Sequence, residues 1–132
     1  MAIRVVRLGA PRTAGEGLRL GTVRRPPRGV RKEEYARRDY FDLWLPDLAP
    51  SAELVKYALS QPFTPERWAN YAKRYRREMK EPPAQRLLAL LAALSHQTDF
   101  SIGCYCENPD RCHRSLLRDL LGESGAEIAE SS

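Results

Sequence analysis

Two short segments near the N-terminus have the spacing of apolar and polar residues that is typical of strands. Residues 3–8 (IRVVRL) are mostly aliphatic, and residues 17–23 (GLRLGTV) place Leu18 and Leu20 on one side of an extended chain. The link between them is rich in glycine and proline, and RRPPRG (residues 24–29) prevents the second strand from continuing. The pattern therefore predicts two strands joined by a loop.

The middle of the chain has the periodicity of helices. Ser51 is suited to cap a helix that runs to Leu59, and Thr64 followed by Pro65 is a strong start for a second helix. That second helix has an apolar stripe formed by Trp68, Tyr71, Ala72, Tyr75 and Met79. Helical spacing explains this stripe fully, so we expect it to pack in the core rather than to stack on a nucleic-acid base.

Three further segments complete the pattern. YFDLWL (40–45) is predicted to be a buried strand or a docked turn, and a leucine-rich helix follows EPPAQ (81–85). TDFSIGCYCE (98–107) reads as a strand with Cys104 and Cys106 on one side, and residues 108–122 read as a helix that starts near Asn108 and Pro109.

The order of these elements predicts an α/β fold class, with a small, mostly parallel central sheet flanked by helices. We expect one domain over residues 1–121, followed by a flexible acidic tail over residues 122–132.

Composition narrows the class of protein. A chain of 132 residues can bury a core without disulfides, and its three cysteines cannot all pair, so we predict reduced thiols and a cytoplasmic location. The sequence predicts neither a signal peptide nor a membrane span of ~20 apolar residues. The net charge of +5 favours a small anionic ligand and is compatible with nucleic acid. The oligomeric state is not indicated.

All three cysteines lie in CYCENPDRCHRSLL (104–117), and the phase of the predicted helix orients the side chains around them. Cys112 and His113 continue its apolar stripe and should face the sheet. The arginines of this segment fall together on a different face and should turn toward solvent or a ligand; they are Arg111, Arg114 and Arg118.

Several interpretations of this segment are open. Cys112 in the first helical turn could be a nucleophile with His113 as acid and base, because a helix dipole and nearby arginines favour a thiolate. A phosphate could bind at the helix N-terminus beside Arg114 without any thiol chemistry. The cysteines could also pack as small apolar residues. A metal site is disfavoured because Cys112 and His113 are adjacent and zinc sites usually show paired C-x2-C spacing. No metal and no cofactor are therefore assigned.

Four motifs in the chain resemble one known family. CYCENPDRCHRSLL is similar to the C-x-C-x5-C-H-R-S-L-L signature of the family called domain of unknown function 488. PPRGVRK, FDLWLPDLAPSAEL and TPERWANYAKRYRREM resemble motifs of its short YeaO-like branch, with Pro26 in place of a tryptophan. The resemblance runs from about Ile3 to Leu121. It implies an α/β fold with a central sheet between helices, and it implies no activity.

The leading functional hypothesis is a cleft that binds a phosphate-bearing or other anionic ligand. The family pattern falls on Arg24, Arg28 and Gly29 in the loop after the second strand. In the last motif it falls on Cys104, Cys106, Cys112, His113 and Arg114. If the strands before these segments run parallel, the two groups meet at one edge of the sheet. The arginines and Gly29 would bind the ligand. Cys112 and His113 would either be catalytic residues or line the cleft without a chemical role. The alternative is a non-catalytic module that binds nucleic acid or protein, with a structural cysteine cluster.

Overall fold

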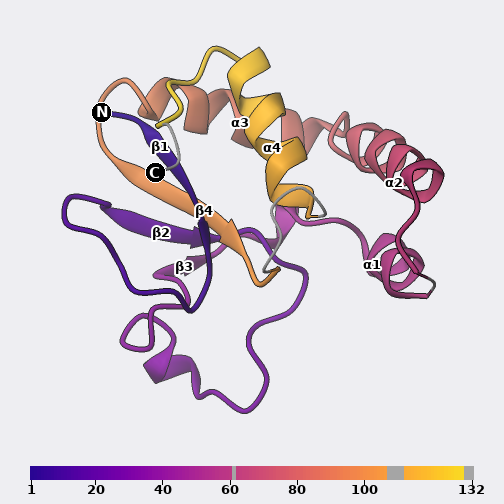
Figure 1. Cartoon of the computed structure of the whole chain (residues 1–132). Coiled ribbons are helices and arrows are strands. Elements are labelled where there is room, and N and C mark those ends of the chain that lie inside the picture. The colour runs from indigo at the N-terminus through magenta and orange to yellow at the C-terminus, as the bar shows by residue number, and fades with distance from the viewer. Residues whose placement is uncertain (61, 107–111, 130–132) are drawn as a thin grey trace.

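The computed structural model describes residues 1–60, 62–106 and 112–129, which form a single small α/β domain (Figure 1). The strands are β1 (Ile3–Arg7), β2 (Leu18–Gly21), β3 (Leu43–Trp44) and β4 (Phe100–Cys104). The α-helices are α1 (Ala52–Leu59), α2 (Pro65–Glu78), α3 (Pro82–Leu94) and α4 (His113–Glu123). Two short 3-10 helices are η1 (Lys32–Glu34) and η2 (Pro46–Leu48).

The sheet is parallel throughout, with the strand order β1-β4-β2-β3. β4 is central and pairs with both β1 and β2, so that Ile102 lies between Val5 and Leu20. The prediction of a small, mostly parallel sheet is confirmed. Because parallel strands end at the same edge, the segments that follow β2 and β4 emerge side by side.

The helices in the middle of the chain begin where their capping residues predict. The Ser51 side chain accepts a hydrogen bond from the Leu54 backbone N–H, and the Thr64 side chain accepts one from Arg67. The apolar stripe of α2 packs in the core, with Tyr71, Tyr75 and Met79 buried, as its spacing predicts. Of the helices in the described part of the chain, none is both long and apolar enough to cross a membrane.

The main core lies between the sheet and the helices. Ile3, Leu20, Phe100 and Ile102 point from the strands into this core, where they meet the apolar sides of α2, α3 and α4. Helix α4 contacts β1 and β4 and also packs against α2 and α3. The N-terminal end of α4 is thereby fixed close to the end of β4.

The other side of the sheet is covered by the long connections between β1 and β3. A methyl group on Gly21 would come within 2.3 Å of the Phe41 ring, and one on Gly103 would come within 2.8 Å of the Leu8 side chain. Both strands thus need glycine where these connections approach them. The resemblance implied a sheet between helices, but within the described residues the α-helices pack on one side.

The segment after α4 returns to the sheet. Ile128 forms a parallel bridge with Ile3, the Ile3 N–H donates to the Glu127 carbonyl, and the Ala129 N–H donates to the Ile3 carbonyl. Ala126 also packs against the main core. Ile128, expected to belong to a flexible tail, therefore pairs with the sheet beside β1.

Candidate functional site

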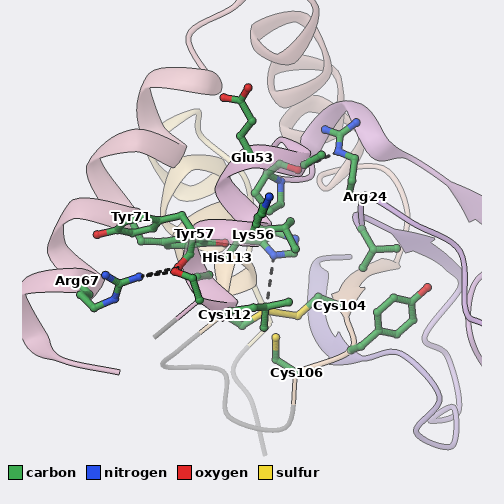
Figure 2. Close-up of a pocket in the computed structure, with 18 of the residues that line it drawn as sticks. Arg24, Glu53, Lys56, Tyr57, Arg67, Tyr71, Cys104, Cys106, Cys112 and His113 are labelled. Carbon is green, nitrogen blue, oxygen red and sulfur yellow. Dashed lines mark hydrogen bonds between the residues drawn. A yellow bond between two sulfur atoms is a disulfide. The ribbon is translucent and has the colours of Figure 1, made fainter. Parts of the chain in front are cut away.

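A large pocket opens at the carboxyl ends of β2 and β4 (Figure 2). Its volume is about 1130 Å³. Val23 and Arg24 line it after β2, the three cysteines line it beside β4, and His113 lines it at the start of α4. The remaining wall comes from α1, α2 and the connection between them, including the aromatic residues Tyr57, Phe63, Trp68 and Tyr71. This is the edge at which ligands bind in open parallel sheets.

Cys112 is the N-cap of α4, and its backbone is extended (φ −127°, ψ 148°). The prediction that Cys112 lies in the first turn is thus off by one residue. The start expected near Asn108 and Pro109 lies outside the described residues. The prediction that Cys112 and His113 face inward is confirmed, since their relative exposures are 2% and 6%.

His113 is tied to the end of β2 through one ring nitrogen. Its Nε2 lies 2.5 Å from the carbonyl oxygen of Thr22, which can only accept, so Nε2 carries the proton. Its Nδ1 faces the Cys112 sulfur at 3.7 Å. The pKa of His113 is lowered from 6.5 to about 4, chiefly by burial and also by the positive charge of Arg114, while the hydrogen bond to Thr22 opposes the shift. The imidazole is therefore neutral near pH 7, with its Nδ1 lone pair turned to the sulfur.

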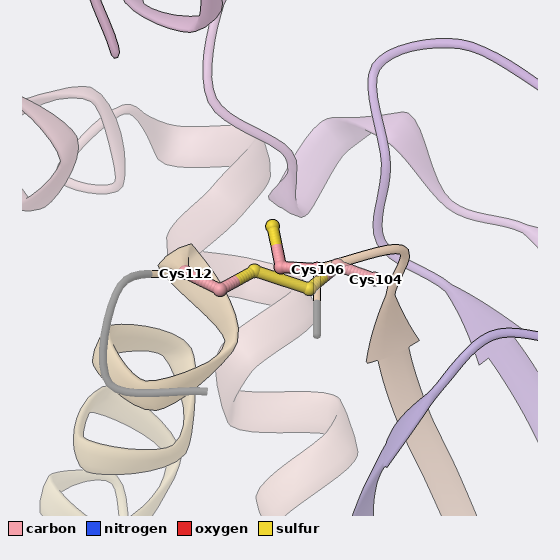
Figure 3. Close-up of side chains that lie close together, drawn as sticks. All are labelled: Cys104, Cys106 and Cys112. Atoms are coloured by element: carbon pink, nitrogen blue, oxygen red, sulfur yellow. A yellow bond between two sulfur atoms is a disulfide. The ribbon is translucent and has the colours of Figure 1, made fainter. Parts of the chain in front are cut away.

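Cys112 forms a disulfide with Cys104, eight residues earlier in the chain (Figure 3). The structure joins these two sulfurs, whereas the sequence predicted reduced thiols. The close approach arises because the end of β4 and the start of α4 lie at the same sheet edge. Cys106, two residues beyond β4, is exposed and unpaired. The three sulfur atoms lie within 4.8 Å of one another, a spacing that could also hold a metal ion.

Arg24 lines the pocket, but much of its guanidinium is already engaged. Its Nε donates to the Pro50 carbonyl at 2.9 Å, and Nη2 donates to the carbonyls of Pro46 and Ala49, each at 3.2 Å. These bonds fasten the loop after β2 to η2 and to the start of α1. Arg24 therefore shapes the wall of the pocket.

The prediction that Arg114 turns outward is wrong. Its relative exposure is 5%, and its Nη1 donates to the Val6 carbonyl in β1 at 3.0 Å. Its buried charge lies close enough to lower the pKa of His113. Arg118 is exposed as predicted, and Arg111 lies outside the described residues.

Arg28 and Gly29 lie in the exposed connection between β2 and η1, and neither lines the pocket. Gly29 has a φ of +72°, which glycine adopts without steric cost. Of the predicted site residues, the structure brings together Arg24, Cys112 and His113 around the pocket, and it places Arg28, Gly29 and Arg114 elsewhere.

Three basic residues of the pocket were missed in the sequence. One of them, Arg67, is already engaged, since its Nη2 donates to the Tyr57 carbonyl and to the Ser60 hydroxyl. The other two, Arg25 and Lys56, line the pocket, and within the described residues their side chains make no hydrogen bond or ion pair. Arg25 is next to a predicted residue and could have been considered. Nothing in the sequence marks Lys56 as a site residue, because a single lysine on the exposed side of a helix is common. Trp68 and Tyr71 were correctly predicted to pack, yet they also form part of the pocket wall.

Comparison with known proteins agrees with the resemblance. Residues 3–125 match the model of the family DUF488-N3a, described as the active DUF488-N3 subclade. Uncharacterised proteins from two strains of Mycobacterium tuberculosis and from Mycobacterium bovis are each 29% identical over 119 residues, covering 90% of this chain and 92% of theirs. No solved structure matches. Assignment to the YeaO-like branch stays a prediction. The chain belongs to the domain of unknown function 488 family, within its N3 subclade.

Proposed function

We propose that this domain binds a phosphate-bearing ligand with an apolar body in the pocket, and that reduced Cys112 acts on it as a nucleophile with His113 as its base. The observation that carries the proposal is the orientation of His113. Its Nε2–H donates to the Thr22 carbonyl, so the unprotonated Nδ1 is the atom that faces the Cys112 sulfur, 3.7 Å away. A base oriented in this way by a third group is the arrangement that activates nucleophilic cysteines in enzymes.

The ligand class follows from the chemistry of the wall. Tyr57, Trp68 and Tyr71 offer apolar and aromatic surface, which suits a flat or apolar body. Arg25 and Lys56 supply uncommitted positive charge, and Glu53 is the acidic residue that lines the same pocket. An anionic group held by the two cations, with its apolar body directed toward α2, fits this distribution of charge.

The proton and electrons of the proposed step balance within the site and ligand. The Cys112 thiol gives its proton to His113 Nδ1, and the sulfur forms a bond to an electrophilic atom of the ligand. The bond from that atom to its leaving group breaks, and the leaving group takes the proton from Nδ1. Because burial disfavours an isolated imidazolium at His113, thiolate and imidazolium form as a pair, in which each charge stabilises the other. The step requires the Cys104–Cys112 disulfide to be reduced.

Alkylation of single-cysteine variants tests the nucleophile. In Cys104→Ala/Cys106→Ser only Cys112 reacts, and we expect the pH midpoint of its reaction with iodoacetamide to lie well below the ~8.5 of an ordinary thiol. The matched control is Cys104→Ala/Cys112→Ser. Its Cys106 should titrate later, because desolvation raises the pKa of this thiol more than Arg114 and Arg7 lower it. A Cys112 midpoint at or above that of Cys106 would refute the nucleophile.

Binding of phenyl phosphate tests the ligand class. Trp68 lines the pocket and Trp44 does not, so fluorescence of Trp68 should report binding, and Trp44→Phe should keep that signal. We expect phenyl phosphate to bind at least tenfold more tightly than phenol or inorganic phosphate, because only the ester combines the apolar body and the charge. Lys56→Met should weaken binding, and Arg28→Ala, outside the pocket, should leave it unchanged.

Two outcomes would count against this ligand class. Equal affinity for phenol and phenyl phosphate would show that Arg25 and Lys56 do not bind the phosphate. Tight, steeply salt-dependent binding of an oligonucleotide that survives Cys112→Ser, but is lost when Arg24, Arg28 and Arg31 are neutralised, would favour a nucleic-acid module instead.

A further inference from the structure

Three sulfur atoms converge at the floor of the pocket from separate points along the chain. Cys104 ends β4, Cys106 lies two residues beyond it, and Cys112 caps α4 (Figure 3). Their sulfurs lie within 4.8 Å of one another, and all three residues line the pocket. One of the sulfurs is exposed and the other two are buried, so the group can be reached from solvent through Cys106.

We propose that in the reduced chain Cys104, Cys106 and Cys112 bind one soft metal ion, of the class of Zn²⁺ or Cu⁺, through three thiolates. Thiolate sulfur is the ligand that these ions prefer. With metal–sulfur distances of about 2.3 Å, the sulfurs of a tetrahedral site lie roughly 3.8 Å apart. Reduction of the disulfide lets the Cys104 and Cys112 sulfurs move apart, and side-chain rotation brings the group to that spacing.

The backbone separation of Cys104 and Cys112 also suits an ion. Their Cα atoms lie 7.6 Å apart. Direct disulfides usually join Cα atoms about 4.4–6.8 Å apart. Two cysteines that share an ion need room for the ion between their sulfurs, so the wider separation accommodates the ion without movement of β4 or α4.

The charge of the surroundings is compatible with three thiolates. Arg114 is buried nearby, and Arg7 donates from its Nε to the Tyr105 carbonyl, next to Cys106. Both positive charges lower the pKa of the Cys106 thiol, although its desolvation raises that pKa by more. Three thiolates with one divalent ion leave a net charge of −1, which these arginines offset. Each thiol releases its proton to solvent on binding, so affinity should fall as the pH is lowered.

This site goes beyond the proposed function, because it describes a different state of the same cysteine. An ion held by Cys112 excludes the Cys104–Cys112 disulfide, and it also removes the sulfur that the nucleophile needs. The metal-loaded chain should therefore resist alkylation at Cys112, and chelation should restore the reaction. The disulfide, the free thiol and the metal complex are three alternative states of one cluster.

Titration with Co²⁺, a spectroscopic substitute for Zn²⁺, tests the site in the full chain. The protein is reduced, freed of reductant without oxygen and titrated until thiolate-to-cobalt charge-transfer absorption saturates. We expect saturation at one ion per chain and displacement of cobalt by Zn²⁺. Cys106→Ser should reduce the affinity at least tenfold. It is the decisive variant, because Cys106 is exposed and contributes nothing to the core.

The controls separate this proposal from the preceding one. Lys56→Met should weaken phenyl phosphate binding and keep the cobalt spectrum, since Lys56 lines the pocket but is not one of the three cysteine ligands. Absence of charge-transfer absorption in the reduced chain would overturn the metal site. Cobalt binding that is unchanged in Cys106→Ser would overturn it too. Neither result would affect the alkylation and fluorescence tests, which use chelator-treated protein.

Discussion

Two clusters of buried polar side chains lie in this domain, and they differ in how completely their hydrogen-bonding groups are used. In the first, Arg19 and Glu16 form a paired salt bridge, with side-chain exposures of 1% and 2%. Arg19 donates from Nε and Nη2 to the two carboxylate oxygens, and from Nη1 to the carbonyls of Ala10 and Asp39. In the second, His113 donates from Nε2 to Thr22, but among the described residues its Nδ1 meets the Cys112 sulfur alone.

The difference separates a structural role from a chemical one. The Arg19 cluster lies on the side of β2 opposite Leu20, and it holds together the two connections that cover that side of the sheet. In the described part of the chain, four of the five N–H groups of its guanidinium already donate to protein acceptors, and Arg19 does not line the pocket. The His113 cluster lines a pocket and keeps one basic lone pair beside a sulfur. Burial of polar groups is therefore not enough to indicate a functional site. A better indication is a buried polar atom that lacks a strong hydrogen-bond partner and faces a cavity.

The largest effect should come from breaking the saturated cluster. Arg19→Met leaves the Glu16 carboxylate buried without its partner, and we expect the free energy of unfolding to fall by about 3–5 kcal/mol. Urea denaturation followed by circular dichroism measures it. Arg19→Met/Glu16→Leu is the matched control and should recover much of the loss, because no uncompensated charge stays buried. A loss below about 1 kcal/mol in the single variant would show that the carboxylate finds another partner.

Acid should destabilise the protein through the second cluster. The folded pKa of His113 is about 4, below its ordinary 6.5, so between these values the unfolded chain binds the proton more tightly. The stability is complete above pH 6.5 and is lost as the pH falls toward 4, by about 3 kcal/mol in total. Denaturation at several pH values in this window measures the slope.

His113→Asn is the control for this pH dependence, since it removes the titrating group and should flatten the curve between pH 6.5 and 4. NMR titration of the His113 ring in the native chain provides an independent measurement that needs no variant. A ring that titrates near 6.5 would contradict the burial argument.

A smaller effect is expected on the reactivity of Cys112. His113→Gln in the Cys104→Ala/Cys106→Ser background removes the base beside the sulfur, and we expect alkylation near pH 6.5 to slow about tenfold, a difference of about 1.4 kcal/mol. The alkylation rate is measured by quenching the reaction at set times and determining the modified fraction by mass spectrometry. Lys56→Met is the matched control, because it changes charge in the same pocket without touching the imidazole. Equal alkylation rates in the His113→Gln variant and its parent would show that His113 does not act as the base for Cys112.

The sequence predicted the elements whose signals are local. Ser51 and Thr64 begin α1 and α2 because a capping side chain and its backbone partner lie three residues apart. The parallel sheet followed from the order of strands and helices. The inward direction of Cys112 and His113 followed from the phase of one helix, which is also a local property.

The features that the sequence did not predict depend on partners elsewhere in the fold. Arg114 turns inward to a carbonyl 108 positions earlier, and His113 is oriented by one 91 positions earlier. No pattern around residue 114 contains that information. The disulfide joins residues only eight positions apart, but it depends on where the end of β4 meets the start of α4. Lys56 enters the site only because α1 forms one of its walls.

The smallest effect should come from the edge of the first cluster. Arg12 pairs with Asp42 at 2.8 Å, and both side chains keep about a quarter of their surface exposed. Arg12 holds the pKa of Asp42 below its ordinary value against the opposing effect of burial, and Asp42 also accepts from the Arg19 backbone N–H. Because water reaches and screens this partly exposed pair, Arg12→Met should lower the free energy of unfolding by no more than about 1 kcal/mol. Urea denaturation beside Arg19→Met gives the contrast directly. A loss of stability as large as that of Arg19→Met would mean that the two arginines act as one network. Arg12 would then belong to the buried cluster rather than to its solvent-exposed edge.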